Sequence, residues 1–224
     1  MSKLKEKSDY GLQIRVIADV SHVKLCQPGN PIRYADIFDN THSRLVAAIY
    51  PLYQNDIDFH REIYEAMSAV FGAEYELLSF LIRPRLRDQL YVNWASLVQP
   101  QTPSDDVKWF LYVIATLINP NPPPIIAIDR LETNLHPIMQ QIAMEYAIEA
   151  ARHTRVHITT QSPTILESLE DAEPMPIITT VETLDGQTNL RTLSAKAVLE
   201  YAKHYSLGDL LRTNEIKLIE SEMS

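Results

Sequence analysis

The chain has 224 residues, the size of one ordinary domain, and its 46% apolar and 22% charged residues match the globular average, which argues against disorder. Its formal net charge of −9 argues against a protein that coats nucleic acid, because phosphate neutralisation requires a basic surface. The single cysteine, Cys26, excludes an intramolecular disulfide, and we find neither a secretory signal nor an apolar stretch of membrane-spanning length. We therefore expect a soluble, cytoplasmic protein.

The first segment of the chain predicts strands and two helices. Residues 11–35 hold two short apolar runs around a Pro/Gly/Asn cluster, which predicts either a hairpin or a strand followed by a loop. Apolar residues at helical spacing predict one helix over 43–53. They predict a second helix that Asp56 or Asp58 caps and Gly72 ends.

Two strands rich in Leu, Tyr, Val and Trp are predicted over residues 75–83 and 87–94. Arg83, Arg85 and Arg87 alternate near their junction, so on a strand they would point to one side. Such a row is either a nucleic-acid contact or a solvated edge that charge protects from further pairing. We favour the solvated edge, and a polar loop with helix-capping residues follows.

Helices and strands alternate in the second half of the chain. The predicted elements are a helix over 107–118, a strand over 125–128, a helix over 137–152, a strand over 155–160 and a helix over 165–169. Because these strands are apolar throughout, the pattern is typical of a parallel sheet covered on both faces. Residues 177–184 and 188–193 flank Asp185-Gly186, which predicts a hairpin, and residues 195–211 predict a helix.

The strand over 125–128 ends on an acidic residue, Asp129. A buried parallel strand places such a carboxylate at the C-terminal edge of the sheet, where ligands of open α/β folds bind. In nucleotide hydrolases an aspartate at this place holds magnesium, usually through water. An apolar strand followed by aspartate also arises by chance, so the surrounding residues decide its meaning.

Residues 122–137, Pro-Pro-Pro-Ile-Ile-Ala-Ile-Asp-Arg-Leu-Glu-Thr-Asn-Leu-His-Pro, resemble the Walker B and D-loop segment of RecF-like and OLD-like ABC ATPases, which reads Asp-Glu-Pro-Glu and then Leu-His-Pro. Residues 157–163, His-Ile-Thr-Thr-Gln-Ser-Pro, stand where that family has Thr-His-Ser-Pro. Ser104-Asp105-Asp106 stands at its Ser-Asp-Gly signature loop. The resemblance spans roughly residues 40–212 and implies the C-terminal half of a P-loop ATPase fold.

The resemblance implies an α/β fold with a mostly parallel sheet flanked by helices and a C-terminal hairpin plus helix. Residues 1–100 would form the N-terminal helical and β lobe, and residues 101–224 the half that carries the Walker B, D-loop and switch motifs. ATP and Mg²⁺ are the implied cofactors. The implied site residues are Asp129 for Mg²⁺, Ser104, His136 and Gln161 for the nucleotide, and Glu132 as the candidate catalytic acid. His136 is either the D-loop histidine or simply the residue that starts a helix beside Pro137.

Several departures from the family pattern argue against hydrolysis. The chain has five glycines and no Gly-Lys pair, so it lacks the Walker A loop that cradles phosphates. Arg130 replaces the glutamate that polarises the attacking water, and a cation cannot act as that base. Gln161 replaces the switch histidine. Asp106 replaces the signature glycine and, with Asp105, puts negative charge where an anion should dock.

These observations lead to a hypothesis and two alternatives. The chain is a degenerate ABC-type ATPase domain that acts as a non-hydrolysing binding or regulatory module in prokaryotic DNA repair or defence. Its partner is another ATPase-type chain or a second copy, and it contacts nucleic acid only through that complex and no membrane. Alternatively, it is one subunit of a split ATPase whose Walker A half is a separate chain, or a truncated remnant without function.

Overall fold

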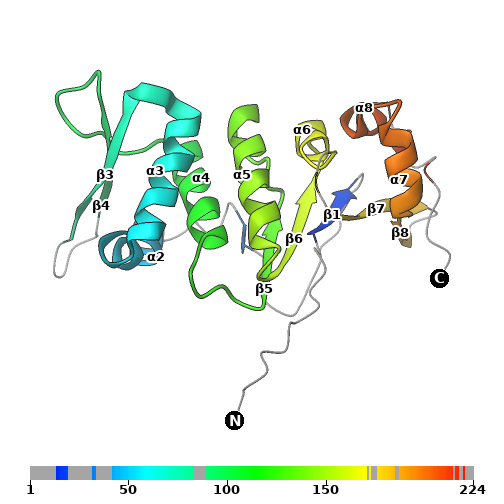
Figure 1. Cartoon of the computed structure of the whole chain (residues 1–224), viewed down its shortest axis with the longest axis horizontal. Coiled ribbons are helices and arrows are strands. Elements are labelled where there is room, and N and C mark those ends of the chain that lie inside the picture. The colour runs from blue at the N-terminus through cyan, green and yellow to red at the C-terminus, as the bar shows by residue number, and fades with distance from the viewer. Residues whose placement is uncertain are drawn as a thin grey trace, which may run out of the picture.

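The computed structural model describes residues 14–19, 32–33, 42–82, 89–170, 172, 176–184, 187–213, 215–216 and 219. These residues form a six-stranded sheet, a separate two-stranded sheet and a set of helices packed between and beside them (Figure 1). None of the helices in these ranges combines the length and apolar character that crossing a membrane requires.

The six-stranded sheet has the strand order β2-β5-β6-β1-β7-β8. Its strands are β1 (Ile14–Asp19), β2 (Ile32–Arg33), β5 (Ile125–Asp129), β6 (Arg155–Thr160), β7 (Ile177–Leu184) and β8 (Gln187–Thr192). All neighbouring pairs are parallel except β7 and β8, which pair antiparallel. The predicted mostly parallel sheet and C-terminal hairpin are therefore confirmed. The inward residues of β5 and β6, such as Ile128 and Ile158, are buried, as expected for central strands.

The two N-terminal strands belong to this sheet. β1 lies between β6 and β7, and β2 pairs with β5. The hairpin interpretation of residues 11–35 is therefore wrong, because β1 and β2 pair with later strands and not with each other. The strand of the alternative interpretation is present as β1, and the loop predicted after it lies outside the described residues. The domain boundary at residue 100 stays a prediction; β1 and β2, which lie before it, pair with strands that lie after it. The arginine row at residues 83–87 lies outside the described residues.

A helical layer and a small hairpin pack beside the sheet. The helices are α2 (His42–Asn55), α3 (Ile57–Phe71), α4 (Asp105–Leu117), α5 (Pro137–Ala150), α6 (Pro163–Glu167), α7 (Ala195–Ala202) and α8 (Leu207–Arg212), and a short 3-10 turn, η1, spans Gly72–Glu74. The hairpin consists of β3 (Tyr75–Leu81) and β4 (Gln89–Trp94). Trp109 and Phe110 of α4 are fully buried in the shared core. Buried residues of α2 to α5, of β3 to β6 and of β7 form one continuous hydrophobic core.

The ends of α3 follow from its sequence. Asp56 is the N-cap and accepts a hydrogen bond from the backbone N–H of Phe59 at 3.0 Å. Of the two predicted caps, Asp56 is therefore confirmed and Asp58 is not the cap. Gly72 ends the helix with a φ of +59°, a left-handed conformation that glycine adopts without steric cost.

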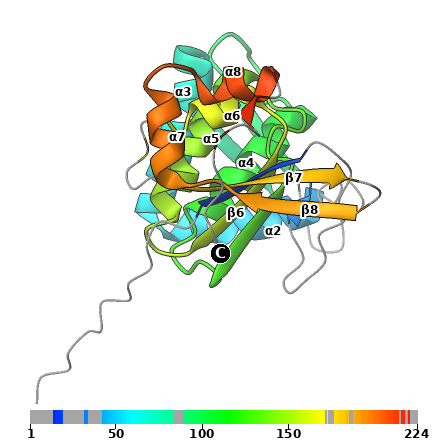
Figure 2. The ribbon, with the colours of Figure 1, turned by 90° about the vertical axis from the view of Figure 1, so that its right-hand side faces the viewer.

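The C-terminal helical region differs from the prediction of one helix over 195–211. It contains two helices, α7 and α8, which lie with α6 on the same side of β7 and β8 (Figure 2). The chain breaks before Leu207 because the Ser206 hydroxyl accepts a hydrogen bond from the Gly208 N–H at 3.1 Å and so starts a new helix. The Glu170 carboxylate accepts a second one from the Leu207 N–H at 2.7 Å and ties α8 to the end of α6.

Candidate functional site at the sheet edge

The parallel strands β5 and β6 end at the same edge of the sheet, where the Thr159 side chain joins them. The Thr159 hydroxyl donates a hydrogen bond to Asp129 Oδ1 at 2.6 Å. The same hydroxyl accepts one from the backbone N–H of Arg130 at 2.7 Å. The predicted magnesium ligand is thus fixed at the end of β5, and one of its oxygens already bonds to the neighbouring strand.

Glu132 bonds to the segment in which β6 ends. Its Oε2 accepts a hydrogen bond from the Thr160 hydroxyl at 2.8 Å, and its Oε1 accepts one from the Gln161 backbone N–H at 2.9 Å. The Thr160 oxygen in turn accepts a bond from the Ser162 N–H at 2.9 Å. We name Glu132, Thr160 and Gln161 the carboxylate clasp. It uses both oxygens of the carboxylate that the sequence predicts as the catalytic acid.

The turn that carries Glu132 has an unusual backbone. Arg130 has a φ of 55° and Asn134 a φ of 60°, both left-handed. Asparagine tolerates this region, whereas for a side chain such as arginine it costs about 1–2 kcal/mol. Turn hydrogen bonds from the Thr133 N–H to the Arg130 carbonyl at 2.9 Å and from the Leu135 N–H to the Glu132 carbonyl at 3.0 Å hold it. The turn therefore points the Arg130 backbone N–H at Thr159 and the Glu132 carboxylate at the end of β6.

The buried side chain of Gln140 links the turn that carries Glu132 to the segment that follows β6. Gln140, on the first turns of α5, donates from Nε2 to the Leu135 carbonyl at 2.8 Å and accepts from the Ser162 hydroxyl at 2.6 Å. Only 7% of its surface is exposed. Sequence reasoning missed Gln140, Thr159 and Thr160. The available signal was their polar character at positions that otherwise face the core.

In the described hydrogen bonds, the side chains of the remaining predicted residues, His136 and Ser104, do not join the clasp. His136 is the exposed N-cap residue of α5 and makes no side-chain capping bond, and Pro137 follows at the first helical position. Ser104 is the exposed N-cap residue of α4, also without a side-chain capping bond. Trp109 of α4 donates its indole N–H to the Leu131 carbonyl at 3.3 Å, which joins α4 to the Glu132 turn. The roles of His136 and Ser104 in nucleotide binding stay predictions.

The described residues of this edge form no phosphate cradle, and residues 20–31, which follow β1, lie outside the described residues. In P-loop folds the glycine-rich loop follows a strand directly. Here β1 lies beside the clasp, with Ala18 opposite Thr160, and the sequence after it contains no glycine before Gly29 and no Gly-Lys pair. The first turn of α4 carries Asp105 and Asp106, opposite in sign to what an anion requires. Within the described ranges, no group of three or more His, Cys, Asp or Glu residues could hold a metal ion.

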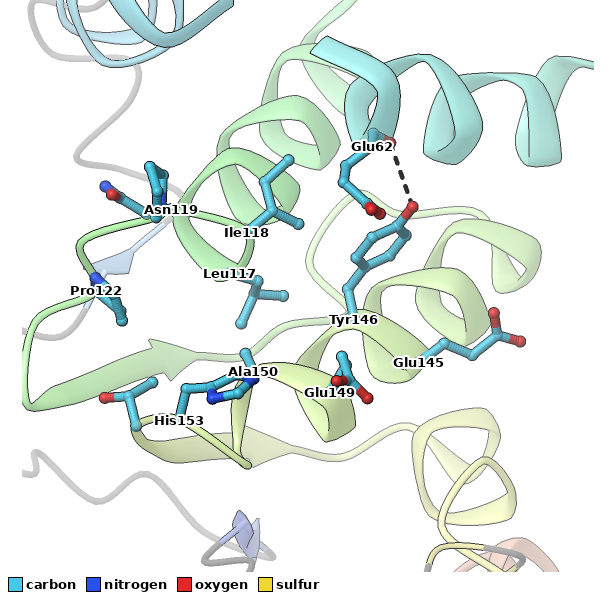
Figure 3. A pocket seen from close by; sticks show the side chains of 12 residues that line it. Glu62, Leu117, Ile118, Asn119, Pro122, Glu145, Tyr146, Glu149, Ala150 and His153 are labelled. Atoms are coloured by element: carbon cyan, nitrogen blue, oxygen red, sulfur yellow. Dashed lines mark hydrogen bonds between the residues drawn. The ribbon is translucent and has the colours of Figure 1, made fainter. Parts of the chain in front are cut away.

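A cavity of about 680 Å³ lies away from this edge, at the far end of α5. The ends of α4 and α5, the loop between α4 and β5, and Glu62 of α3 form its walls (Figure 3). Sequence reasoning did not identify it, because it depends on how three helices pack.

No protein-family model matches this sequence, and no curated protein matches it either. Among solved structures, an SMC head bound to the C-terminal winged-helix domain of ScpA matches with a TM-score of 0.50 and 12% identity over 75% of this chain and 55% of that chain. An SMC head domain from Thermotoga maritima matches with a TM-score of 0.45 and 15% identity over 73% of this chain and 53% of that one. A chain from a study of ATP-driven dimerization and DNA-stimulated activation of SMC ATPases matches with a TM-score of 0.47 and 13% identity over 64% of this chain and 88% of that one.

These values bear on the fold alone. This chain spans about half the length of two of the three head structures. The likeness at a TM-score of 0.50 supports an α/β fold similar to that of an SMC head domain, which agrees with the predicted fold class at that level.

Proposed function

We propose that this chain is a non-hydrolysing relative of RecF-like and OLD-like ABC ATPases that acts as a binding or regulatory module in prokaryotic DNA repair or defence. The carboxylate clasp carries the proposal, because both oxygens of Glu132 accept hydrogen bonds from the end of β6. The family context rests on the resemblance of residues 122–137, 157–163 and the signature-loop position.

Two features of the edge argue against hydrolysis by the isolated chain. Arg130 stands where the water-polarising glutamate would be, and a guanidinium stays protonated and cannot accept the proton of water. Glu132 would have to leave two hydrogen bonds to act as a base, and hydrogen bonds to charged groups contribute about 1.5–3 kcal/mol each. The clasp therefore favours a structural role for Glu132, which joins the D-loop turn to the switch strand.

The partner that we propose is another ATPase-type chain or a second copy of this one. The exposed residues Pro137 and Ile138 follow His136 at the start of α5, and 39% of the Ile138 surface is exposed. An exposed apolar residue beside the predicted D-loop suits a protein contact. One similar SMC head was solved bound to a domain of ScpA. The net charge of −9 supports contact with nucleic acid only through such a complex.

The filled interior of the sheet favours this module over a split enzyme. A separate Walker A half would have to supply a strand beside β6, and β1 already takes that place between β6 and β7. The described sheet has no gap between its strands. This favours a protein with a selected function over a truncated remnant. Cooperative thermal unfolding of the purified chain would support it, whereas aggregation in isolation would support the split or remnant alternatives.

The test is a phosphate-release assay on the purified chain, with a nucleotide-binding titration in the presence and absence of Mg²⁺. We expect no turnover above the Asp129→Ala control. Any nucleotide that binds should lose affinity in Asp129→Ala when magnesium is present. If the purified chain alone hydrolysed ATP, and Asp129→Ala abolished that hydrolysis, the proposal would be wrong.

A further inference from the structure

We propose that the cavity at the far end of α5 binds an alkylammonium group, that is, a primary amine cation on an aliphatic stem. The cavity is about 680 Å³ in volume, within the range of small-ligand sites. α5 has 14 residues, so about 21 Å separate its start at the clasp from its end at the cavity. The cavity is therefore independent of the predicted nucleotide edge, and the inference does not rest on the proposed function.

Apolar side chains form one part of the wall. Leu117 and Ile118 come from the end of α4, Pro122 from the following loop, and Ala150 from the last turn of α5. In Figure 3 Leu117 and Ile118 lie beside the Tyr146 ring. This part of the wall offers no charge to a ligand, but it can cover an aliphatic stem and remove it from water.

Carboxylates form another part of the wall. Glu62 of α3 and Glu145 and Glu149 of α5 line the cavity. Arg152 pairs with Glu149 at 3.1 Å, and Arg61 divides its guanidinium between Asp58, Glu65 and Glu62. Glu145 has no ion pair with any residue in the described part of the chain. The lining thus holds three carboxylates against one imidazole, that of His153, which suits a cationic ligand.

Tyr146 places an aromatic ring between the apolar and acidic parts. Its hydroxyl donates a hydrogen bond to the Glu62 backbone carbonyl at 3.2 Å, which fixes the ring (Figure 3). Burial, and then the charge of Glu62, raise the pKa of Tyr146, so the phenol stays a neutral donor at physiological pH. The face of a fixed tyrosine ring attracts an ammonium ion, with about 0.5–1 kcal/mol at partly exposed sites.

The combination of an apolar wall, an aromatic ring and surrounding carboxylates selects the chemical class. A bare metal ion would gain nothing from Leu117, Ile118 and Ala150, and an anion would be repelled by three glutamates. An ammonium group on a short aliphatic stem suits the apolar, aromatic and acidic parts of the wall together. Such a group occurs in a free diamine or in the side chain of a lysine on a peptide.

The test is a calorimetric titration of the whole chain with diaminopentane, with pentanediol as the neutral ligand of the same length. We expect saturable binding of the diamine and at least about tenfold weaker binding of the diol, because only the diamine carries the charge. Raising the salt concentration should weaken the diamine binding. Titration with an acetylated Gly-Lys-Gly amide distinguishes the sources: binding as tight as that of the diamine assigns a lysine side chain, and weaker binding assigns a free amine.

A matched pair of variants locates the binding. Glu145→Gln removes one charge from the cavity wall, and Glu200→Gln removes one from the exposed surface of α7, where Glu200 pairs with Lys203 at 2.7 Å. We expect the dissociation constant of the diamine to rise about fivefold in Glu145→Gln and less than twofold in Glu200→Gln. Equal effects in the two variants, equal binding of diol and diamine, or no saturable binding would each overturn the inference.

Discussion

The two ends of α5 use their polar side chains in different ways. At its start, Gln140 bonds to Leu135 and Ser162, and the nearby Glu132 bonds to Thr160 and Gln161, so the polar groups are satisfied within the protein. At its end, the exposed residues Glu145 and Glu149 are among those that line a cavity with an apolar part. Bonds within a site stabilise the fold and oppose a ligand, whereas a carboxylate without an ion pair in the described residues, such as that of Glu145, is available to one. The sequence motifs lie at the start of α5, and at this end the polar side chains therefore serve mainly to stabilise the fold.

Among the substitutions that test this comparison, Glu132→Ala should lower the unfolding free energy most. The substitution removes the acceptor for the buried Thr160 hydroxyl and for the Gln161 N–H. Leaving a buried donor unsatisfied costs about 1–3 kcal/mol, so we expect unfolding in urea to show a loss of about 2–3 kcal/mol. Glu200→Ala on the surface of α7 is the control and should change the midpoint little. A stability equal to that of wild type would mean that the clasp does not support the edge.

The second effect concerns α8, which packs on the helix after the clasp. A Cβ at Gly208 would lie 2.3–2.7 Å from the Glu167 side chain, too close for any van der Waals contact. Glu167 would have to move, which disturbs its ion pair with Arg212 at 3.0 Å. We expect Gly208→Ala to destabilise the protein by about 1–3 kcal/mol in thermal or urea unfolding.

Shortening Glu167 provides the matching control for that prediction. In Glu167→Ala the side chain that the new Cβ meets is gone, so adding Gly208→Ala to this background should cost much less than in wild type. Equal costs in the two backgrounds would show that the α6–α8 contact is not what requires glycine.

A smaller change, of opposite sign, is expected at Arg130. Its φ of 55° is unfavourable for a side chain, and glycine removes that strain but makes the unfolded chain more flexible. We expect Arg130→Gly to raise the unfolding free energy by about 0.5–1 kcal/mol. Asn134→Gly, at a φ of 60°, should give a smaller gain because asparagine already tolerates this region. Destabilisation by Arg130→Gly would assign the arginine side chain a stabilising contact at the edge.

Local signals in the sequence predicted much of the fold. The Asp56 cap, the Gly72 stop and the apolar strand ending on Asp129 each depend on a few neighbouring residues, and each lies where expected. The place of β1 was not predictable in this way. Its register, with Val16 opposite Ile158, joins residues far apart in the chain, and parallel pairing leaves no turn signal between its strands.

The candidate site was predictable only where its residues are neighbours in the chain. Asp129 and Glu132 were identified from one continuous segment, but the bonds that occupy Glu132 come from residues 28 and 29 positions away. The cavity depends on contacts between residues that are still farther apart along the chain, since Tyr146 and Glu62 are separated by 84 positions. Sequence patterns identify residue types at a site, and packing decides whether their polar atoms are free for a ligand.

The last substitution, Tyr146→Phe, tests the cavity end of α5. The substitution keeps the ring and removes one hydrogen bond to the Glu62 carbonyl, at a cost of about 0.5–1.5 kcal/mol near neutral pH. The pH dependence of the unfolding free energy is a more specific test of Tyr146. Because the pKa of Tyr146 is raised in the folded state, the unfolded chain ionises first, and wild type should lose stability as the pH rises above the ordinary tyrosine pKa of about 10.

Tyr146→Phe should therefore lose less stability than wild type between neutral pH and about pH 11, as measured by urea unfolding at each pH. Tyr75 provides a control, because burial also raises its pKa and it lies away from the cavity, on β3. Its contribution remains in Tyr146→Phe, so the variant should keep part of the alkaline slope. If the slopes of wild type and Tyr146→Phe were the same, Tyr146 would titrate alike in the folded and unfolded chain. Its ring would then be too solvated to provide the aromatic part of the cavity wall.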